Sequence, residues 1–112
     1  MDCIFCKIAT GEIPSDTVFE DDNFRVILDL SPASKGHMLI LPKTHARDIT
    51  ELDEEIAGKA LVLAGKLGRA AMSALSATGF NTLANTGESA GQTVFHCHIH
   101  VIPRLVWRMV RQ

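Results

Sequence analysis

Three of the five histidines of this 112-residue chain lie close together near its C-terminal end, at alternate positions. His96, His98 and His100 are separated by single apolar residues. Because successive side chains of a β-strand point to opposite faces, a strand over 94–102 would carry all three imidazoles on one face, about 6.7 Å apart. On a helix the same spacing would scatter them over three sides. The pattern therefore predicts a histidine-lined strand, which we expect Pro103 to end because proline lacks an N–H for the ladder. The opposite face would carry Phe95, Cys97, Ile99 and Val101.

An accessible imidazole on a rigid strand can act as a nucleophile, as a general acid or base, or as a metal ligand. His98 stands between the other two histidines, so it could attack phosphorus while its neighbours donate to a phosphate or a leaving group. Such an attack requires an unprotonated Nε2, with the Nδ1–H held by an acceptor such as a main-chain carbonyl. Just before the histidines lie Gly91, Gln92 and Thr93. They offer main-chain N–H groups, an amide and a hydroxyl, all of which can bind phosphate oxygens. The sequence therefore favours chemistry at a phosphate group.

A second group of candidate ligands begins with Cys3 and Cys6. A Cys-x-x-Cys pair by itself is compatible with zinc binding, redox chemistry or two free thiols. No strand–helix–strand pattern surrounds the pair, which argues against a thioredoxin-like role. A structural zinc needs four ligands, and the remaining candidates are His45 and His96.

Composition and charge exclude several other classes of protein. The chain is 46% hydrophobic and 21% charged, with a net charge of −2, so it has no basic footprint for a nucleic-acid polymer. It has no run of 18 apolar residues that could span a membrane, and its first residues lack the basic and apolar regions of a secretory signal. An odd number of cysteines argues against a disulfide framework. We therefore expect one soluble domain over 1–112 in a reducing cytoplasm.

The apolar patterns also predict the elements that must position these side chains. We expect a short helix at 3–10, strands at 17–20, 24–28 and 36–42, a loop at 44–52, a long helix capped by Asp53 that ends at 78–79, and a strand at 80–85. Within the long helix, Gly58, Gly65 and Gly68 are expected to allow close packing. The links between most strands are too short for parallel crossovers. The predicted fold class is therefore α+β, with a mainly antiparallel five-stranded sheet, one long helix and one short helix.

The run 96–102 resembles the signature of the histidine-triad (HIT) family, His-φ-His-φ-His-φ-φ, in which φ is apolar. The resemblance covers nearly the whole chain, through the blocks 3–8, 11–14, 19–21, 29–32, 36–45, 85–87 and 91–93. The chain is therefore identified as a member of the bacterial Hint-like branch of that family. The tail at 105–112 does not align with it.

This resemblance implies a homodimer that binds purine nucleotides such as AMP and hydrolyses bonds at the α-phosphate, as a nucleoside phosphoramidase or a dinucleoside polyphosphate hydrolase. It implies that His98 is the nucleophile and that Asp29 holds the ribose hydroxyls. Support for the phosphate and the triad would come from His37, His96 and His100. The phosphate site would be lined by Asn85, Gly91, Gln92 and Thr93, and the base pocket by Phe5, Ile8, Ile27 and Leu30. Some family members carry zinc at the corresponding positions, which implies a structural zinc on Cys3, Cys6, His45 and His96.

Two other functions remain compatible with these residues. The first is a zinc hydrolase in which His96, His98 and another histidine hold a catalytic ion, since histidines at i and i+2 on a strand can chelate one metal. That hypothesis leaves Asp29 without a role, and chelation would separate it from a His98 nucleophile. The second is a nucleotide-binding sensor or scaffold with negligible turnover, which an assay on a nucleoside phosphoramidate would separate.

Overall fold

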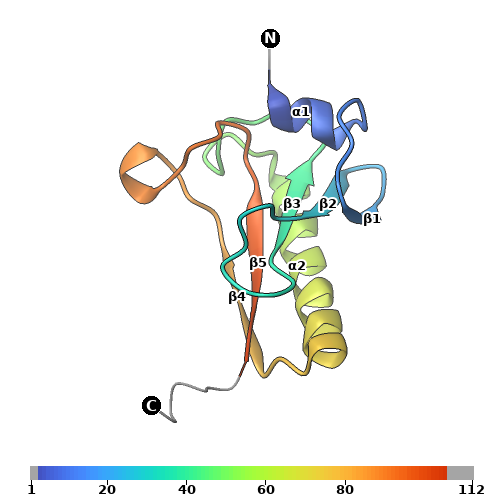
Figure 1. Ribbon diagram of the computed structural model, residues 1–112. Coiled ribbons are helices and arrows are strands. Elements are labelled where there is room, and N and C mark those ends of the chain that lie inside the picture. The colour runs from blue at the N-terminus through green and yellow to red at the C-terminus, as the bar shows by residue number, and fades with distance from the viewer. Residues whose placement is uncertain (1–2, 106–112) are drawn as a thin grey trace.

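The protein is an α+β fold built on one five-stranded sheet, seen in a computed structural model that describes residues 3–105 (Figure 1). The elements are α1 (Ile4–Ala9), β1 (Thr17–Glu20), β2 (Phe24–Leu28), β3 (Met38–Pro42), α2 (Glu54–Leu75), β4 (Gly79–Leu83), the short 3₁₀ helix η1 (Glu88–Ala90) and β5 (Ile99–Arg104). The strand order is β1-β2-β3-β5-β4, and every neighbouring pair is antiparallel. The predicted fold class is confirmed. Of the predicted tail, only Leu105 lies within the described residues.

The two helices cover opposite faces of the sheet. The long helix α2 packs on β3, β4 and β5, where Ala64 and Leu67 join a core with Val26, Ile40 and Val101. The short helix α1 packs against the other face, where a smaller core is made by Phe5, Ile8, Ala9, Ile27, Leu39 and Leu41. Alternate residues of β2 and β3 therefore supply the two cores, as the two-residue period of a strand requires.

The long helix begins as predicted and ends earlier. The Asp53 carboxylate accepts the main-chain N–H groups of Glu55 and Ile56, at 3.1 and 3.2 Å, which caps the first turn. The helix stops at Leu75, and Ser76 takes a left-handed conformation with φ of 58°. The predicted end at 78–79 is wrong because Gly79 is already the first residue of β4, opposite Arg104 on β5.

Close packing is observed at one of the three helix glycines. A Cβ at Gly68 would overlap the ring of Phe80, so the absence of a side chain lets α2 approach β4. At Gly58 and Gly65, apart from the two chain neighbours and the adjoining backbone of α2 itself, no atom of the described residues lies within 4 Å of a Cβ position. The predicted packing role is therefore wrong for these two residues within this chain.

The predicted histidine strand forms only from Ile99 onward. Pairing with β3 covers three positions of β5, from Ile99 opposite Ile40 to Val101 opposite Met38. The segment before it is held differently, because the Cys97 N–H donates to the carbonyl of Ala46 at 2.6 Å. The segment 94–98 is therefore tied to the loop after β3 rather than to the strand itself.

Two further expectations about the histidine segment are corrected. Pro103 does not end the strand, which continues to Arg104, since the part of β5 that pairs with β3 stops at Val101 and Pro103 lies beyond it. Phe95, which was expected on the same face as Cys97, Ile99 and Val101, does not join these residues in the core. It is half-buried, and the guanidinium carbon of Arg47 lies 4.4 Å from its ring centroid.

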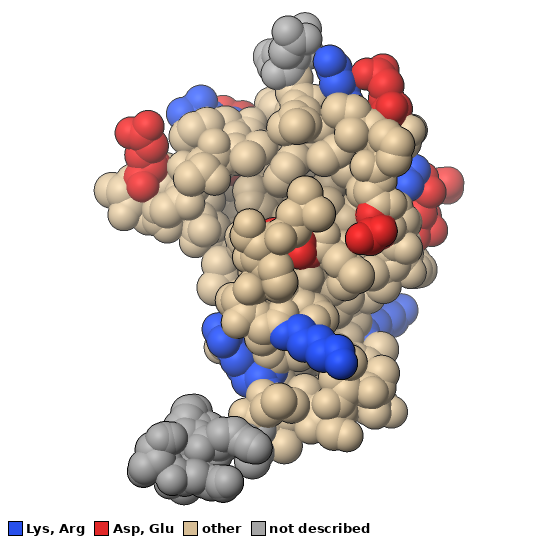
Figure 2. Space-filling view, viewed as in Figure 1, with Lys and Arg blue, Asp and Glu red and all other residues tan. Residues whose placement is uncertain are grey.

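The surface of the described residues is mixed in charge. On the face shown in Figure 2, acidic side chains lie over the upper and middle part, mixed with some basic ones, and the charged side chains of the lower part are Lys and Arg. None of the helices within residues 3–105 is long and apolar enough to cross a membrane.

Candidate active site

His98 is held in one orientation by the main chain. Its Nδ1 lies 2.7 Å from the carbonyl oxygen of His96. Because a carbonyl can only accept a hydrogen bond, Nδ1 carries the hydrogen and Nε2 carries the lone pair of the neutral ring. The ring of Phe5 on α1 packs edge-on against the imidazole, with 5.0 Å between the centroids. His98 therefore has the tautomer and the support that a nucleophile at this position needs.

A chain of hydrogen bonds fixes the tautomers of two neighbouring imidazoles. The main-chain N–H of Ala33 donates to Nδ1 of His37 at 2.9 Å, so the hydrogen of a neutral His37 is on Nε2. That Nε2–H donates to Nδ1 of His100 at 2.9 Å, which leaves the hydrogen of His100 on its own Nε2. This Nε2 is buried and has no hydrogen-bond partner among the described residues. A buried N–H without a partner costs about 1–3 kcal/mol, which an acceptor on a ligand would recover.

Burial keeps both members of this chain neutral. It lowers the pKa of His37 and of His100 below the usual 6.5, and for His100 the nearby imidazoles of His98 and His37 lower the pKa further. The direction of the bonds from Ala33 to His100 therefore persists at neutral pH.

Asp29 lies at the His37 end of the imidazole group. Its Oδ1 accepts the N–H of Ser31 at 3.0 Å, and its Oδ2 lies 3.4 Å from Nε2 of His37. The side chain is 20% exposed, so lone pairs remain open to solvent. The carboxylate can thus accept further hydrogen bonds from a ligand without leaving its place.

The residues expected in a base pocket are only partly gathered. Phe5 and Ile8 of α1 pack over Ile27 of β2, which is 6% exposed, and they form an apolar wall. Leu30 is 93% exposed and does not join them. The apolar wall is therefore made from α1 and β2 alone.

The loop between β4 and β5 is braced by Gln92. This side chain is 2% exposed; its Oε1 accepts the N–H of Gly87 at 2.9 Å, and its Nε2 donates to the carbonyls of Arg47 and Val94. Both amide hydrogens are used within the protein, so Gln92 positions the loop and has no N–H left for a phosphate.

The other expected phosphate residues lie along the same loop. Gly91 has a φ of 94° and lies against the Asn85 amide, which is 3.7 Å from its Cβ position. Thr93 is exposed and lines a hollow with Arg47. The structure therefore keeps Asn85 and Gly91 together and places Thr93 near Arg47.

Four predicted metal ligands come together beside this group. The ligand atoms of Cys3, Cys6, His45 and His96 all lie within 4.8 Å of one another. Nδ1 of His96 is 3.3 Å from Sγ of Cys3, 3.4 Å from Sγ of Cys6 and 3.2 Å from Nδ1 of His45. In a tetrahedral zinc site, bonds of about 2.3 Å to sulfur and about 2.0–2.1 Å to nitrogen separate the ligand atoms by about 3.3–3.8 Å. The three separations from Nδ1 of His96 are close to this range.

The surroundings of the cluster also fit a metal ion. The Nε2–H of buried His96 donates to the carbonyl of Pro42 at 2.8 Å, so the lone pair on Nδ1 faces the two sulfurs. Burial, together with the hydrogen bond and charge of the neighbouring Cys3, raises the pKa of the Cys6 thiol to about 11. A cation between the two thiols would reverse this effect. His98 is not in the cluster, so the structure does not gather His96 and His98 around one ion as the zinc-hydrolase hypothesis requires.

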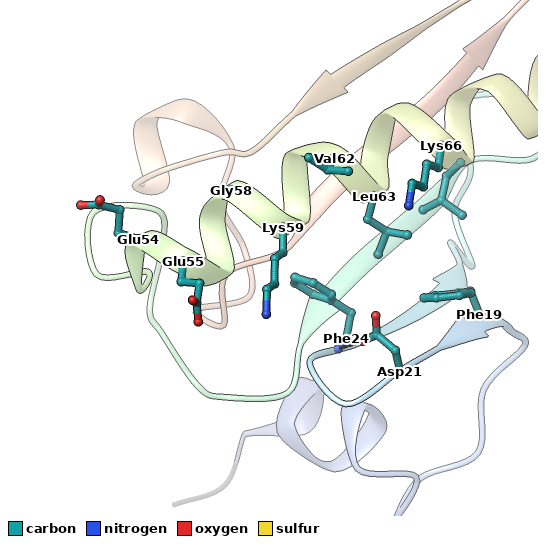
Figure 3. Close-up of a pocket in the computed structure, with 11 residues that line it drawn as sticks. Phe19, Asp21, Phe24, Glu54, Glu55, Gly58, Lys59, Val62, Leu63 and Lys66 are labelled. Carbon is teal, nitrogen blue, oxygen red and sulfur yellow. Dashed lines mark hydrogen bonds between the residues drawn. The ribbon is translucent and has the colours of Figure 1, made fainter.

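One hollow on the described surface is separate from the histidines. It has a volume of about 630 Å³ and lies between α2 and the first two strands. Figure 3 shows Lys59 and Lys66 on α2, with Phe19, Asp21 and Phe24 on the facing hairpin. None of the predicted site residues lines this hollow, and we assign it no chemistry.

The α+β fold thus brings His37, His98 and His100 together, with the Asp29 carboxylate at His37 and the Phe5 ring against His98. The HIT domain model matches residues 10–105, and the chain belongs to the HIT family.

Known relatives agree with this assignment. The chain is 47% identical over 102 residues to Protein hit of Bacillus subtilis, which covers 91% of this chain and 70% of that protein. It is 42% identical over 103 residues to the adenylylsulfatase HINT3 of Arabidopsis thaliana, which covers 92% of this chain and about half, 52%, of that protein. Among solved structures, a zinc-bound histidine-triad protein of Mycobacterium smegmatis superposes with a TM-score of 0.92 at 41% identity, over 97% of this chain and 79% of that one.

Several groups that shape the site could not be found from residue types. The carbonyls of His96 and Pro42 and the N–H of Ala33 belong to the main chain, which every residue carries. Arg47 was also missed, because a single arginine in a loop has no distinguishing pattern.

Proposed function

We propose that this protein is a nucleotide hydrolase that acts at the α-phosphate of a purine nucleotide through a covalent nucleotidyl-His98 intermediate. The observation that carries the proposal is the 2.7 Å contact between Nδ1 of His98 and the His96 carbonyl, which leaves Nε2 free to attack. Family membership supports it, because one relative of this chain is named an adenylylsulfatase. The substrate class we propose is a nucleoside phosphoramidate or a dinucleoside polyphosphate.

The nucleotide would be held at three places. The Asp29 carboxylate would accept hydrogen bonds from the two ribose hydroxyls, since its lone pairs are partly open to solvent. The base would lie against the apolar wall of Phe5, Ile8 and Ile27. The phosphate would then come to the imidazoles, next to Asn85, Gly91 and Thr93.

The reaction would proceed in two displacements at phosphorus. In the first, the lone pair of His98 Nε2 forms a bond to phosphorus, and the leaving group departs with its electron pair and takes up a proton. In the second, water attacks the same phosphorus and gives up a proton to solvent, the P–N bond breaks with its electron pair returning to Nε2 of His98, and the nucleoside monophosphate is released. The His96 carbonyl stabilises the positive charge that His98 acquires in the first step.

His100 is suited to stabilise the phosphate in both steps. Its Nε2–H is buried and has no partner within the described residues, whereas a phosphate oxygen would be an acceptor. His37 positions His100 through the 2.9 Å hydrogen bond and would not contact the phosphate itself. A donor aimed at developing charge commonly contributes 10²–10³-fold in rate.

We also propose that a zinc ion occupies the Cys3–Cys6–His45–His96 cluster. When bound, zinc in a closed four-ligand site supplies cross-linking rather than activation of water. It would join α1, the loop after β3 and the segment before β5. At six residues α1 is too short to be stable alone, yet it carries Phe5, whose ring supports His98.

A homodimer is the third part of the proposal. The strand β4 is at the edge of the sheet, and exposed apolar side chains lie near it, among them Leu83, Ile49 and Leu61. An apolar hollow of about 400 Å³ between α2 and β4 includes these residues. Leu61 and Gly65 lie one turn apart on α2, and the open space at Gly65 would let a partner helix approach closely. Pairing of two copies about a two-fold axis here would cover the exposed edge of β4 and the apolar hollow.

Turnover is tested by incubating the purified protein with adenosine 5′-phosphoramidate and following the release of AMP. Hydrolysis is expected. Binding of AMP without hydrolysis would favour a sensor or scaffold instead.

A further inference from the structure

A second hollow opens beside the Cys3–Cys6–His45–His96 cluster, and of its lining residues only Thr93 has so far been placed near the phosphate. It has a volume of about 450 Å³ and is lined by Cys3, Ile4, His45, Arg47, Thr93, Val94 and Phe95. Two of these residues, Cys3 and His45, belong to the cluster around His96. The hollow therefore borders the four-ligand cluster that contains His96.

Arg47 is the charged group of this hollow. Its guanidinium stacks over the ring of Phe95, with 4.4 Å from its central carbon to the ring centroid. Within residues 3–105 it makes no ion pair. Arginine presents its donors in a planar fork, which a stacked ring holds in a fixed plane, and this fork matches carboxylate, phosphate and sulfate groups. The exposed hydroxyl of Thr93 adds a donor to the same hollow.

The hollow lies at the opposite end of the imidazole group from Asp29. Ring centroids of His37 and His100 are 5.1 Å apart, those of His100 and His98 are 5.2 Å apart, and those of His96 and His45 are 5.1 Å apart. Asp29 lies beside His37, and Arg47 shares the hollow with His45. A nucleotide with its ribose on Asp29 and its phosphate at His98 would thus direct the other substituent of phosphorus toward Arg47.

We propose that Arg47 and Thr93 bind the leaving group of the substrate and select leaving groups that carry an anionic oxygen group. This inference rests on the proposed function and specifies its substrate class. Three kinds of leaving group have the required chemistry: an amine that carries a carboxylate, such as an amino acid; a phosphate chain; and a sulfate. An uncharged amine does not.

The test uses two substrates that differ only in charge, the adenosine 5′-phosphoramidates of alanine and of alaninamide. The Arg47→Ala variant should lose about tenfold in kcat/KM on the alanine substrate and less than twofold on the alaninamide substrate. Arg47→Lys should recover part of the loss, because it restores the charge without the fork. Folding is preserved because Gln92 bonds the main-chain carbonyl of residue 47, which the substitution keeps. Lys66→Ala on α2 removes the same formal charge elsewhere and should leave the ratio of the two substrates unchanged.

The outcomes separate the two proposals. Turnover of both substrates by the wild type, with equal losses or no loss on them in Arg47→Ala, would overturn the role of Arg47 and leave the hydrolase intact. Failure of the wild type to turn over either substrate, adenosine 5′-phosphoramidate or a dinucleoside polyphosphate would overturn the proposed function and this inference with it.

Discussion

The Nδ1 atom of His98 lies 2.7 Å from the carbonyl oxygen of His96, two residues earlier in the chain. This contact is possible because the chain has not yet entered β5, which begins at Ile99. In a regular strand the carbonyl of His96 would point sideways toward a neighbouring strand. The irregular backbone thus supplies the acceptor that fixes the His98 tautomer.

The role of Asp29 predicts a loss of binding rather than of chemistry. Asp29→Asn should weaken the binding of AMP by about 1–3 kcal/mol, because an amide N–H₂ replaces one acceptor of the ribose hydroxyls. Calorimetry should show no such loss for 2′,3′-dideoxy-AMP, which lacks these hydroxyls. Equal losses for both nucleotides would contradict the ribose contact.

The buried histidines predict how stability depends on pH. The pKa values of His37 and His100 are lowered in the folded state, so the unfolded chain takes up protons first as the pH falls below 6.5. The contribution of the two neutral rings is fully present above that pH and is lost as the pH falls from 6.5 toward the folded pKa values. The melting temperature should therefore drop between pH 7.5 and pH 5.5.

The matched comparison is a His37→Gln, His100→Gln double variant, which retains the four-ligand cluster. Its melting temperature should change less over the same interval. An identical change in both proteins would rule out this pair as the source.

The Cys₂His₂ cluster predicts one zinc ion per chain, with Zn–S near ~2.3 Å and Zn–N near ~2.0–2.1 Å by X-ray absorption. Chelation should lower the melting temperature and weaken AMP binding more than it slows the chemistry of bound substrate, since α1 carries Phe5. Cys6→Ser should lose the metal. Cys97→Ala should keep it, because Cys97 is buried in the core on the α2 side. Metal-free protein after purification without chelator would end the proposal.

Leu61 tests the proposed dimer. This side chain is 69% exposed on α2, and Leu61→Glu should place a charge in the interface and give a monomer of about 12.2 kDa in light scattering. The wild type should give twice that mass, and Lys66→Glu on the same helix should not change it. A monomeric wild type at micromolar concentration would disprove the dimer.

The parts of the fold that depend on local chemistry could be predicted from the sequence. The first two strands have the predicted bounds because Asp21 closes their turn, with its Oδ1 accepting from Asn23 and Phe24 at 2.8 Å. The start of α2 follows from its Asp53 cap in the same way. Both signals lie within a few residues of the feature that they specify.

The parts of the fold and the site that depend on tertiary contacts could not be predicted from the sequence. The segment before Ile99 has the alternation of a strand, but its main chain is bonded to Ala46 and its His96 ring to Pro42, more than 40 residues away. The four-ligand cluster was predicted by family resemblance and by counting ligands, and the structure brings its residues together. Family resemblance did not predict the surroundings of Leu30 correctly, because the block 29–32 resembles the family but the Leu30 side chain is exposed.

The covalent step makes His98 the residue whose removal should matter most for rate. His98→Ala should reduce turnover by several powers of ten and leave AMP binding within a few fold, because the ribose and base contacts lie on other residues. Near wild-type hydrolysis of a nucleoside phosphoramidate by this variant would exclude His98 as the nucleophile.

The most direct test of the covalent mechanism is mass spectrometry of the wild-type enzyme quenched in alkali during turnover of adenosine 5′-phosphoramidate. Alkali is used because the bond between phosphorus and an imidazole is labile in acid. We predict a fraction of the protein heavier by one adenylyl group, with the adduct on the peptide that contains His98 and none in His98→Ala. An adduct on a different residue, or rapid turnover by wild type with no adduct at any quench time, would contradict it.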